Sequence, residues 1–343
     1  MSDLKRPSIQ DVSRLAGVSV GTVSNALNKP ERVREATLAK VNAAIDRLGF
    51  IRNDAARQLK AGRSSTIGLV VIDPSNPFFG ALARGAEDFA VSKGYSLVMG
   101  NSANDQDRED AYLRLFEEQR VAGVLVSPVG SNSDSVSKLI NKGMKTILVD
   151  RSSEDQATCS VGVDDVAGGR IAAEHLIEVG RKKLAFVGGP LIIKQVSDRL
   201  LGAKQVVAAN PGITIETFES SAMTVLAGRE VGARIVALSP AVRPDAIFAA
   251  NDLLAVGILQ ALVFQAQVKV PQEIAIIGYD DIDFAEAAIV PLSSIRQPAA
   301  ALGSTAVELL VDEIERPDSH VHRQVSYQPK LVIRASTSEK SSD

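Results

Sequence analysis

Polar and aromatic side chains collect directly after short apolar runs in the body of the chain, where they could bind a small polar ligand. Carboxylate, amide and guanidinium groups bind hydroxyls, and aromatic faces cover the C–H face of a sugar ring. The pattern predicts a site for a polyhydroxylated ligand. The groups are Asp73, Phe78 and Phe79 after the run 67–72, Asp150 and Arg151 after 146–149, Asn251 and Asp252 after 246–249, and Asp280 and Asp281 after 274–277.

Less specific readings of the same residues stay open. Loops at strand ends are polar in most proteins, and Asp73 or Asp252 could simply cap helices. Phe78 and Phe79 could belong to a hydrophobic core.

Catalytic and metal-binding patterns are not evident. The three histidines, His175, His320 and His322, show no nucleophile or metal-ligand spacing, and no G-x-G-x-x-G follows the first apolar run. The single cysteine, Cys159, excludes an internal disulfide framework and fits a reducing compartment. We interpret it as an incidental small apolar residue. We expect no enzyme, no cofactor and no metal.

Alternating elements must position the strand-end residues. Seven apolar runs alternate with amphipathic stretches, which predicts repeated β-α-β units and parallel sheets covered by helices on both faces. Ligands of such folds bind at the carboxyl ends of the strands. The predicted strands are 67–72, 96–99, 123–126, 146–149, 184–187, 246–249 and 274–277, and the helices include 80–92, 107–119, 167–179 and 252–264.

Residues 8–28 carry a second, separate pattern, the sequence form of a helix-turn-helix. Ser8 and Asp11 fit a capping box, Gly17 can end the first helix, and Ser19 is a natural N-cap for the second. An ordinary helical hairpin would give a similar pattern. A third helix is predicted over 34–48, ending at Gly49. Residues 53–60 predict a further short helix, capped by Asn53, that needs a partner to be stable.

The helix-turn-helix region and the rest of the chain carry net charges of opposite sign. Residues 1–63 hold twelve Lys and Arg against six Asp and Glu, so they carry +6, whereas the whole chain of 343 residues carries −3 and the remainder therefore −9. A basic head on an acidic body is the distribution expected of a DNA-binding protein whose body does not touch phosphate. The chain length suggests two or three domains. Aromatic residues are only 4% and Trp is absent, so aliphatic residues must fill the cores.

Taken together, these motifs resemble the LacI/GalR family of transcriptional repressors from about Ile9 to Arg334. The matching segments are 9–12, 18–24, the short-helix pattern of Asn53, Ala56 and Leu59, and Gly278-Tyr279-Asp280-Asp281. The resemblance implies an all-α helix-turn-helix head plus hinge helix, joined to an α/β periplasmic-binding-protein-like core of two doubly wound parallel-sheet subdomains. Arg34 stands where the family usually has a capping serine, which puts an individual phosphate contact in doubt.

DNA-contacting residues follow from the resemblance by position. Val20, Gly21 and Asn25 occupy the recognition-helix positions that choose the operator, and Asn25 could pair with adenine. Leu59 matches the leucine that each subunit inserts into the minor groove. Specific operator binding should therefore weaken more than non-specific binding in Leu59→Ala. The full predicted set is Ser19, Val20, Gly21, Thr22, Asn25, Asn28, Asn53, Ala56, Leu59 and Lys60.

Effector-contacting residues also follow from the resemblance, because the body looks like a periplasmic sugar-binding protein, particularly the ribose-binding one. A further sugar-contacting arginine should fall near Ser197, but only Arg199 is present, two places later. Purine-binding relatives carry polar residues where this chain has Ile192 and Ile193. The predicted effector-binding set is Phe78, Phe79, Asp150, Arg151, Ser197, Arg199, Asn251, Asp280 and Gln297.

The expected function is a sequence-specific repressor whose operator affinity is controlled by a sugar such as ribose. A nucleoside or purine corepressor, or a protein coregulator of a global carbon-control regulator, are the alternatives. The expected partners are double-stranded palindromic operator DNA, the effector and a second copy of the chain. The tail lacks a leucine heptad, which favours a homodimer over a tetramer. No apolar run could form a signal or span a membrane, so we expect a cytoplasmic, nucleoid-associated bacterial protein.

Domain boundaries are expected at three crossings near 163, 295 and 328. The head is 1–52 and the hinge helix and linker are 53–65. The N-terminal subdomain is 66–162 plus 296–327, the C-terminal subdomain is 163–295 plus 328–335, and residues 336–343 are a disordered tail. Closure of the subdomains on the effector would set whether the two hinge helices of a dimer can meet.

Overall fold

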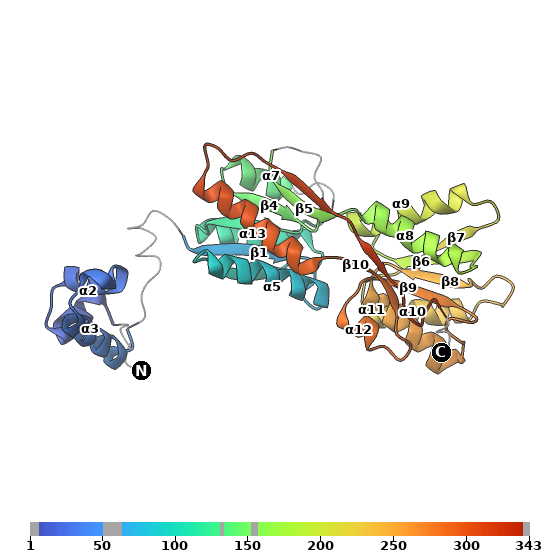
Figure 1. Ribbon diagram of the computed structural model, residues 1–343, viewed down its shortest axis with the longest axis horizontal. Helices are drawn as coiled ribbons and strands as arrows, with labels where there is room; N and C mark the ends of the chain where they lie inside the picture. Colours follow the sequence, from blue (N-terminus) through green and yellow to red (C-terminus); the bar gives the residue numbers. More distant parts are fainter. Residues whose placement is uncertain (1–6, 51–63, 131–133, 152–156, 339–343) are drawn as a thin grey trace. The chain divides into compact units, whose positions relative to one another are not determined.

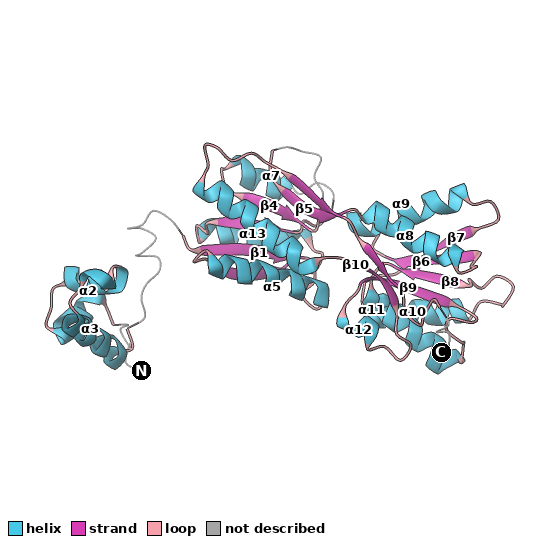
Figure 2. Ribbon diagram, in the orientation of Figure 1, coloured by secondary structure: helices cyan, strands magenta, loops and turns pink. Residues whose placement is uncertain are grey.

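A computed structural model of the protein describes residues 7–50, 64–130, 134–151 and 157–338. The chain divides into two compact units, a head within residues 1–63 and a body within residues 64–343. Figure 1 traces the chain, and Figure 2 distinguishes a head made of helices from a body that holds two sheets.

The head contains α1 (Ile9–Ala16), α2 (Val20–Asn28), a short 3-10 turn (Pro30–Arg32) and α3 (Glu35–Leu48). The predicted capping box is present, because the Ser8 side chain accepts from the Asp11 amide while Asp11 accepts from the Ser8 amide. Gly17 is left-handed with a φ of 66° and ends α1. The Ser19 hydroxyl accepts from the Thr22 amide and starts α2. The local prediction of a helix-turn-helix is confirmed.

A small apolar core holds the three helices together. Val12 of α1, Val23 and Ala26 of α2, and Val41 and Ala44 of α3 are buried against one another. Arg34 precedes α3 without a side-chain capping hydrogen bond, as its departure from the family pattern suggests. The hinge residues Asn53, Ala56, Leu59 and Lys60 lie outside the described residues.

The body contains two six-stranded sheets. The first has the order β11-β5-β4-β3-β1-β2 and the second the order β12-β10-β9-β8-β6-β7. Among the described residues, every strand pairing is parallel except that of β12 with β10. The strands of the first sheet are β1 (Thr66–Val71), β2 (Ser96–Asn101), β3 (Gly123–Val126), β4 (Thr146–Val149), β5 (Ser160–Val163) and β11 (Gln324–Tyr327). Those of the second are β6 (Lys183–Gly188), β7 (Thr214–Glu219), β8 (Ala246–Ala249), β9 (Ala275–Asp280), β10 (Ser293–Arg296) and β12 (Lys330–Val332).

Helices cover both faces of each sheet, as the alternating pattern predicts (Figure 2). The first sheet packs with α5 (Pro77–Ser92), α6 (Gln106–Glu118), α7 (Asp134–Asn141) and α13 (Ala299–Glu315). The second packs with α8 (Asp165–Glu178), α9 (Lys194–Ala209), α10 (Val225–Val236) and α11 (Asp252–Gln260), and α12 (Asp283–Glu286) contacts α11. The helix predicted over 252–264 is α-helical only to Gln260 and continues as a π-helical turn over Ala261–Gln265.

The chain crosses between the two sheets three times: after β5, after β10 and after β11. We call the parts built on the first and second sheets the N-terminal and C-terminal subdomains. Two predicted boundaries are wrong by one residue, because Val163 is still in β5 of the first sheet and Arg296 is still in β10 of the second. Strand pairing holds these residues in their sheets.

The prediction of a disordered tail from residue 336 is wrong for its first residues. Ser336 and Thr337 are buried. The Ser336 hydroxyl donates to the Ile276 carbonyl (2.6 Å), and the Thr337 hydroxyl lies 2.7 Å from His175 Nε2. Their small polar side chains satisfy buried groups of the C-terminal subdomain, which composition alone could not show. Residues 339–343 lie outside the described part. Within the described residues, no helix is long and apolar enough to cross a bilayer.

Candidate functional site

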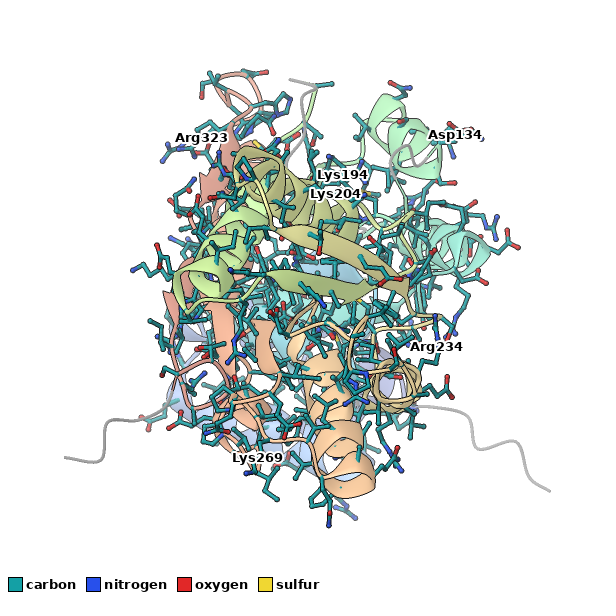
Figure 3. All side chains as sticks on the ribbon, turned by 90° about the vertical axis from the view of Figure 1, so that its right-hand side faces the viewer. Asp134, Lys194, Lys204, Arg234, Lys269 and Arg323 are labelled. Atoms are coloured by element: carbon teal, nitrogen blue, oxygen red, sulfur yellow. The ribbon has the colours of Figure 1, made fainter. Side chains whose placement is uncertain are left out.

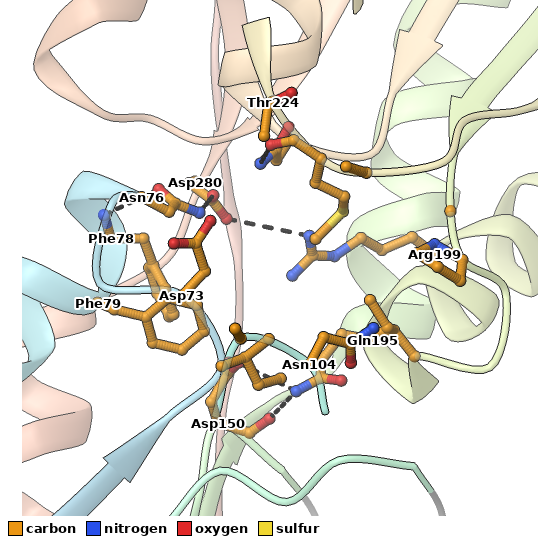
Figure 4. A pocket seen from close by; sticks show the side chains of 18 of the residues that line it. Asp73, Asn76, Phe78, Phe79, Asn104, Asp150, Gln195, Arg199, Thr224 and Asp280 are labelled. Carbon is orange, nitrogen blue, oxygen red and sulfur yellow. Dashed lines mark hydrogen bonds and ion pairs between the residues drawn. The ribbon is translucent and has the colours of Figure 1, made fainter. Parts of the chain in front are cut away.

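A cavity of about 310 Å³ lies at the carboxyl ends of the strands of both sheets. Its walls include the start of α5, the residues after β4 and β8, the end of β9, and α9 (Figure 4). Seven of the nine predicted effector residues line it: Phe78, Phe79, Asp150, Arg199, Asn251, Asp280 and Gln297. The cavity size suits a small ligand.

Arg199 is the central cation of the cavity, and it is only 3% exposed. Its Nε donates to Asp165 Oδ1 (2.8 Å) and its Nη1 to the Ala250 carbonyl (2.7 Å). The guanidinium carbon lies 3.6 Å from the centre of the Tyr279 ring. Burial alone would lower the pKa of Arg199, but the negative charge of Asp165 and further acidic neighbours outweigh it and raise this pKa above its ordinary value.

Close helix packing places Arg199 beside Asp165. A Cβ on Gly169 of α8 would lie 1.9 Å from the Arg199 carbonyl of α9, and one on Gly202 of α9 would lie 2.0 Å from the Val166 carbonyl. Only glycine allows the two backbones to approach so closely. The crossing therefore puts the Asp165 carboxylate within reach of the arginine.

Asp280 faces Arg199 from the end of β9, with Oδ1 3.9 Å from Nη1. It accepts hydrogen bonds from Asn76 Nδ2 (3.0 Å) and Gln297 Nε2 (2.7 Å). Burial raises the pKa of Asp280, and the charge of Arg199 and these two hydrogen bonds offset part of that effect. Its φ of 100° is rare for a residue other than glycine, so the surrounding bonds hold a strained backbone at the site.

Asp150 is the second carboxylate at the cavity. Gln195 Nε2 donates to its carbonyl (2.6 Å) and to its Oδ2 (3.0 Å). Burial raises the pKa of Asp150 well above its usual value, and the charge of Asp165 raises it further. Asp150 Oδ1 and Gln297 Oε1 are buried without a hydrogen-bond partner among the described residues. Both are acceptors that a ligand hydroxyl can satisfy.

Phe78 and Phe79 provide an apolar wall. Both are buried, and their rings meet edge to face with centroids 5.1 Å apart. They belong to the core of the N-terminal subdomain and also line the cavity. The core reading is therefore confirmed, and contact with the effector stays a prediction. Asn251 caps α11 by accepting from the Leu254 amide and donates to the Met223 carbonyl (3.1 Å), while still lining the cavity.

Two predicted effector residues lie elsewhere. Arg151 donates to the Gly130 carbonyl, and Ser197 donates to the Lys194 carbonyl; neither lines the cavity. Ser197 misses it because Gln195 and Arg199, four residues apart on α9, share the helix face that does. Asp252 is also structural, since it accepts from the Ile282 amide and the Ser294 hydroxyl.

Sequence reasoning missed several cavity residues, among them Gln195, Asn104, Met223 and Thr224. None follows an apolar run directly as Asp150 and Asp280 do. Asn76 stands in the polar segment after β1, but its reach across the cavity to Asp280 depends on how the two subdomains meet.

On the head, the exposed side of α2 carries the predicted base-reading residues. Val20 is 42% exposed, and Gly21, Asn25 and Asn28 are exposed as well. Gly21, Asn25 and Asn28 follow at helical spacing and so lie along one side. The Ser19 and Thr22 hydroxyls lie 2.9 Å apart at the start of the helix. An exposed helix of this kind, preceded by a packed helix and turn, is the reading element of helix-turn-helix proteins.

The helix-turn-helix head and the two-sheet body with its polar cavity define a ligand-binding DNA regulator. Comparisons with known proteins agree. Residues 8–53 match the description "Bacterial regulatory proteins, lacI family", and residues 173–337 match "Periplasmic binding protein-like domain". The chain belongs to the lacI family and is a transcriptional repressor rather than an enzyme.

Relatives match over nearly the whole chain. The ribose operon repressor of Escherichia coli is 35% identical over 96% of this chain and 99% of its own length. The transcriptional repressor PurR of Photobacterium profundum is 34% identical over 97% and 99%. A solved LacI-family regulator from Enterococcus faecium with bound ribose has a TM-score of 0.71 and 26% identity, covering 79% of this chain and 98% of that one.

Proposed function

We propose that the cavity binds a sugar, a pentose such as ribose, and that this effector controls operator affinity. The observation that carries the proposal is the pair of buried acceptors without partners, Asp150 Oδ1 and Gln297 Oε1, on the same cavity as Arg199 and two phenylalanine rings. Hydroxyls of a sugar would donate to the acceptors and accept from the guanidinium. The names of the E. coli relative and the ribose-bound structure support the same class.

A nucleoside or purine effector is the second candidate, supported by the name of the PurR relative. Ile193, 5% exposed, is part of the cavity wall at a position where polar residues would suit a base. Ile192 is 69% exposed and lies outside the lining. An isoleucine side chain offers no hydrogen bond to a purine edge, and this favours the sugar.

Bonds across the cavity suggest how the effector acts. Asn76 of the N-terminal subdomain donates to Asp280 of the C-terminal one, and Gln195 of the C-terminal subdomain donates to Asp150 of the N-terminal one. A ligand that competes with or adds to these bonds changes the free energy of closure, and operator affinity changes by the same coupling.

A ligand screen tests this function. Thermal unfolding of the full chain should shift upward with ribose and not with hypoxanthine or guanine. Operator duplexes selected from a random library would then be titrated with and without ribose, which gives the sign of the effect. Stabilisation by purines but not ribose would replace the sugar by a corepressor, and no shift with either would favour a protein coregulator.

A regulator with a palindromic operator is expected to pair with a second copy of itself. The C-terminal subdomain has an exposed apolar groove that suits such a contact. A groove between α11, the π-helical turn and α12 exposes Phe264 (65%), Phe284 (56%) and Ile289 (60%). Large apolar side chains grouped on a surface are typical of an interface. We propose that this groove forms the homodimer contact and that the dimer binds a palindromic operator on the nucleoid.

Sedimentation tests the dimer. Phe284→Asp should shift the protein toward monomer, because a dimer would bury the new charge, and should weaken operator binding. Val242→Asp is the matched control: Val242 is 61% exposed but lies outside the groove. A Phe284→Asp protein that stays dimeric would exclude this surface.

A further inference from the structure

A cluster of metal-binding side chains lies apart from the effector cavity. Cys159 immediately precedes β5, and His320 and His322 lie in the connection from α13 to β11. Their ligand atoms all lie within 4.8 Å of one another. Spacing along the chain gives no sign of this cluster, because Cys159 and His320 are 161 residues apart.

Distances within the cluster fit a tetrahedral ion. Cys159 Sγ lies 3.3 Å from His320 Nε2 and 3.8 Å from His322 Nδ1. Zinc bonds of about 2.1 Å to imidazole and about 2.3 Å to thiolate place tetrahedral S and N ligands about 3.6 Å apart. The two measured separations bracket that value, so an ion fits with small movements of the side chains.

A carboxylate orients one of the imidazoles. His320 Nδ1 lies 2.8 Å from Asp312 Oδ2, which leaves Nε2 directed at the sulfur. Histidine ligands of metals commonly donate their other ring nitrogen to a carboxylate in this way. The Arg323 amide donates to Cys159 Sγ (3.2 Å), a bond that also suits a thiolate ligand. The Arg323 side chain itself points outward (Figure 3).

Acidic side chains near the cluster favour a cation. Glu313, 8% exposed, has its Oε2 buried without a hydrogen-bond partner among the described residues. A bound cation would balance the negative charges of Glu313 and of Asp312, which contacts His320.

We propose that Cys159, His320 and His322 bind one Zn²⁺ ion, with Asp312 as the residue that positions His320. Thiolate and imidazole donors select a borderline ion of this kind over Ca²⁺ or Mg²⁺, which prefer oxygen. Three protein ligands leave a fourth position for water or an exogenous ligand.

Its place in the fold separates this site from effector binding. The cluster lies at the amino ends of the parallel strands β5 and β11, and the cavity lies at the carboxyl ends of the sheet. Both strands lead into crossings to the C-terminal subdomain. A bound ion would join the starts of these two strands and stabilise the N-terminal subdomain by mass action.

Metal titration of the full chain tests the site. Protein freed of metal with a chelator should bind one equivalent of Zn²⁺ and melt at a higher temperature. With Co²⁺ in its place, a thiolate-to-metal charge-transfer band should appear. Cys159→Ser should lose that band, and Asp312→Asn should weaken binding about 10- to 100-fold.

His322→Asn is a mild second variant, because His322 is only half-buried, and it should also weaken binding. His175→Gln is the matched control: it removes the histidine outside the cluster and should bind Zn²⁺ as the wild type does. Absence of binding by folded wild-type protein, or equal binding by Cys159→Ser, would overturn the proposal. Loss of binding in His175→Gln to the same extent would do so as well.

Discussion

Arg199 Nη1 and Asp280 Oδ1 lie 3.9 Å apart, too far for a hydrogen bond but close enough for charge attraction in a buried site. The arginine comes from α9 and the aspartate from the end of β9. Tyr279, the residue before Asp280, places its ring against the guanidinium. Hydrogen bonds to other residues hold both the Arg199 guanidinium and the Asp280 carboxylate in place. The pair therefore presents a donor and an acceptor side by side to whatever enters the cavity.

Asp280→Ala should weaken ribose binding about 10- to 100-fold, the range for losing a hydrogen bond to a charged group. The operator response to the sugar should disappear while operator binding persists, because the head is a compact unit separate from the body that holds Asp280. Calorimetry and an operator titration with and without ribose would check both. Asp88→Ala, at a 72% exposed side chain, is the control, and an unchanged response in Asp280→Ala would remove Asp280 from the effector site.

Arg199→Met should destabilise the body by about 3–5 kcal/mol, because it leaves the buried carboxylates of Asp165 and Asp280 without their cation. Lys194→Met on the same helix removes an exposed pair with Asp198 (2.8 Å) and should cost less than about 1 kcal/mol. Urea unfolding of the ligand-free proteins measures the difference. If both variants lost similar amounts of unfolding free energy, the ion pairs of Arg199 would contribute no more to stability than the surface pair of Lys194.

Asp150→Asn should stabilise the ligand-free protein at neutral pH by about 1–3 kcal/mol, because it removes a buried charge with an unpartnered oxygen. Asparagine tolerates the left-handed backbone of this position, where φ is 57°. The pKa of Asp150 is raised in the folded state. Between the usual aspartate pKa and this raised value, Asp150 is therefore protonated in the folded protein and ionised in the unfolded chain.

The contribution of Asp150 to stability is therefore present at low pH and is lost as the pH rises through the raised value. Unfolding free energies measured from mildly acidic to neutral pH should fall less steeply in Asp150→Asn than in the wild type. Parallel curves would show that Asp150 does not titrate in this way.

Asn25→Ala should reduce specific operator binding by about 1–3 kcal/mol and leave binding to a random duplex unchanged. Asn25 is exposed on α2, and its removal disturbs no buried contact of the head. Both titrations belong at one fixed salt concentration, since salt alone changes affinity. An equal loss on both duplexes would assign Asn25 to phosphate contact.

Local sequence signals predicted the features that depend on neighbours in the chain. Ser8, Gly17 and Ser19 act as caps because capping needs only residues a few positions away. Asp150 and Asp280 line the cavity because each stands at the carboxyl end of a parallel strand, where ligands of such sheets bind. These inferences needed no knowledge of how distant segments pack.

Features that depend on distant packing were not predictable in this way. Short strands such as β5 and β11 have little periodicity of their own and exist because they pair with each other. The approach of Asn76 to Asp280 joins residues 204 positions apart, and the approach of Cys159 to His320 joins residues 161 apart. A single sequence carries no direct signal for such distances.

The three crossings of the chain between the sheets have a consequence for biosynthesis. α13 and β11 complete the N-terminal subdomain, and Leu302, Ala306 and Leu310 of α13 fill its core. A ribosome makes these residues only after the entire segment 164–296 of the C-terminal subdomain. α5 covers β1 and β2 early, but the part of the sheet that α13 covers stays exposed until nearly the whole polypeptide has left the exit tunnel.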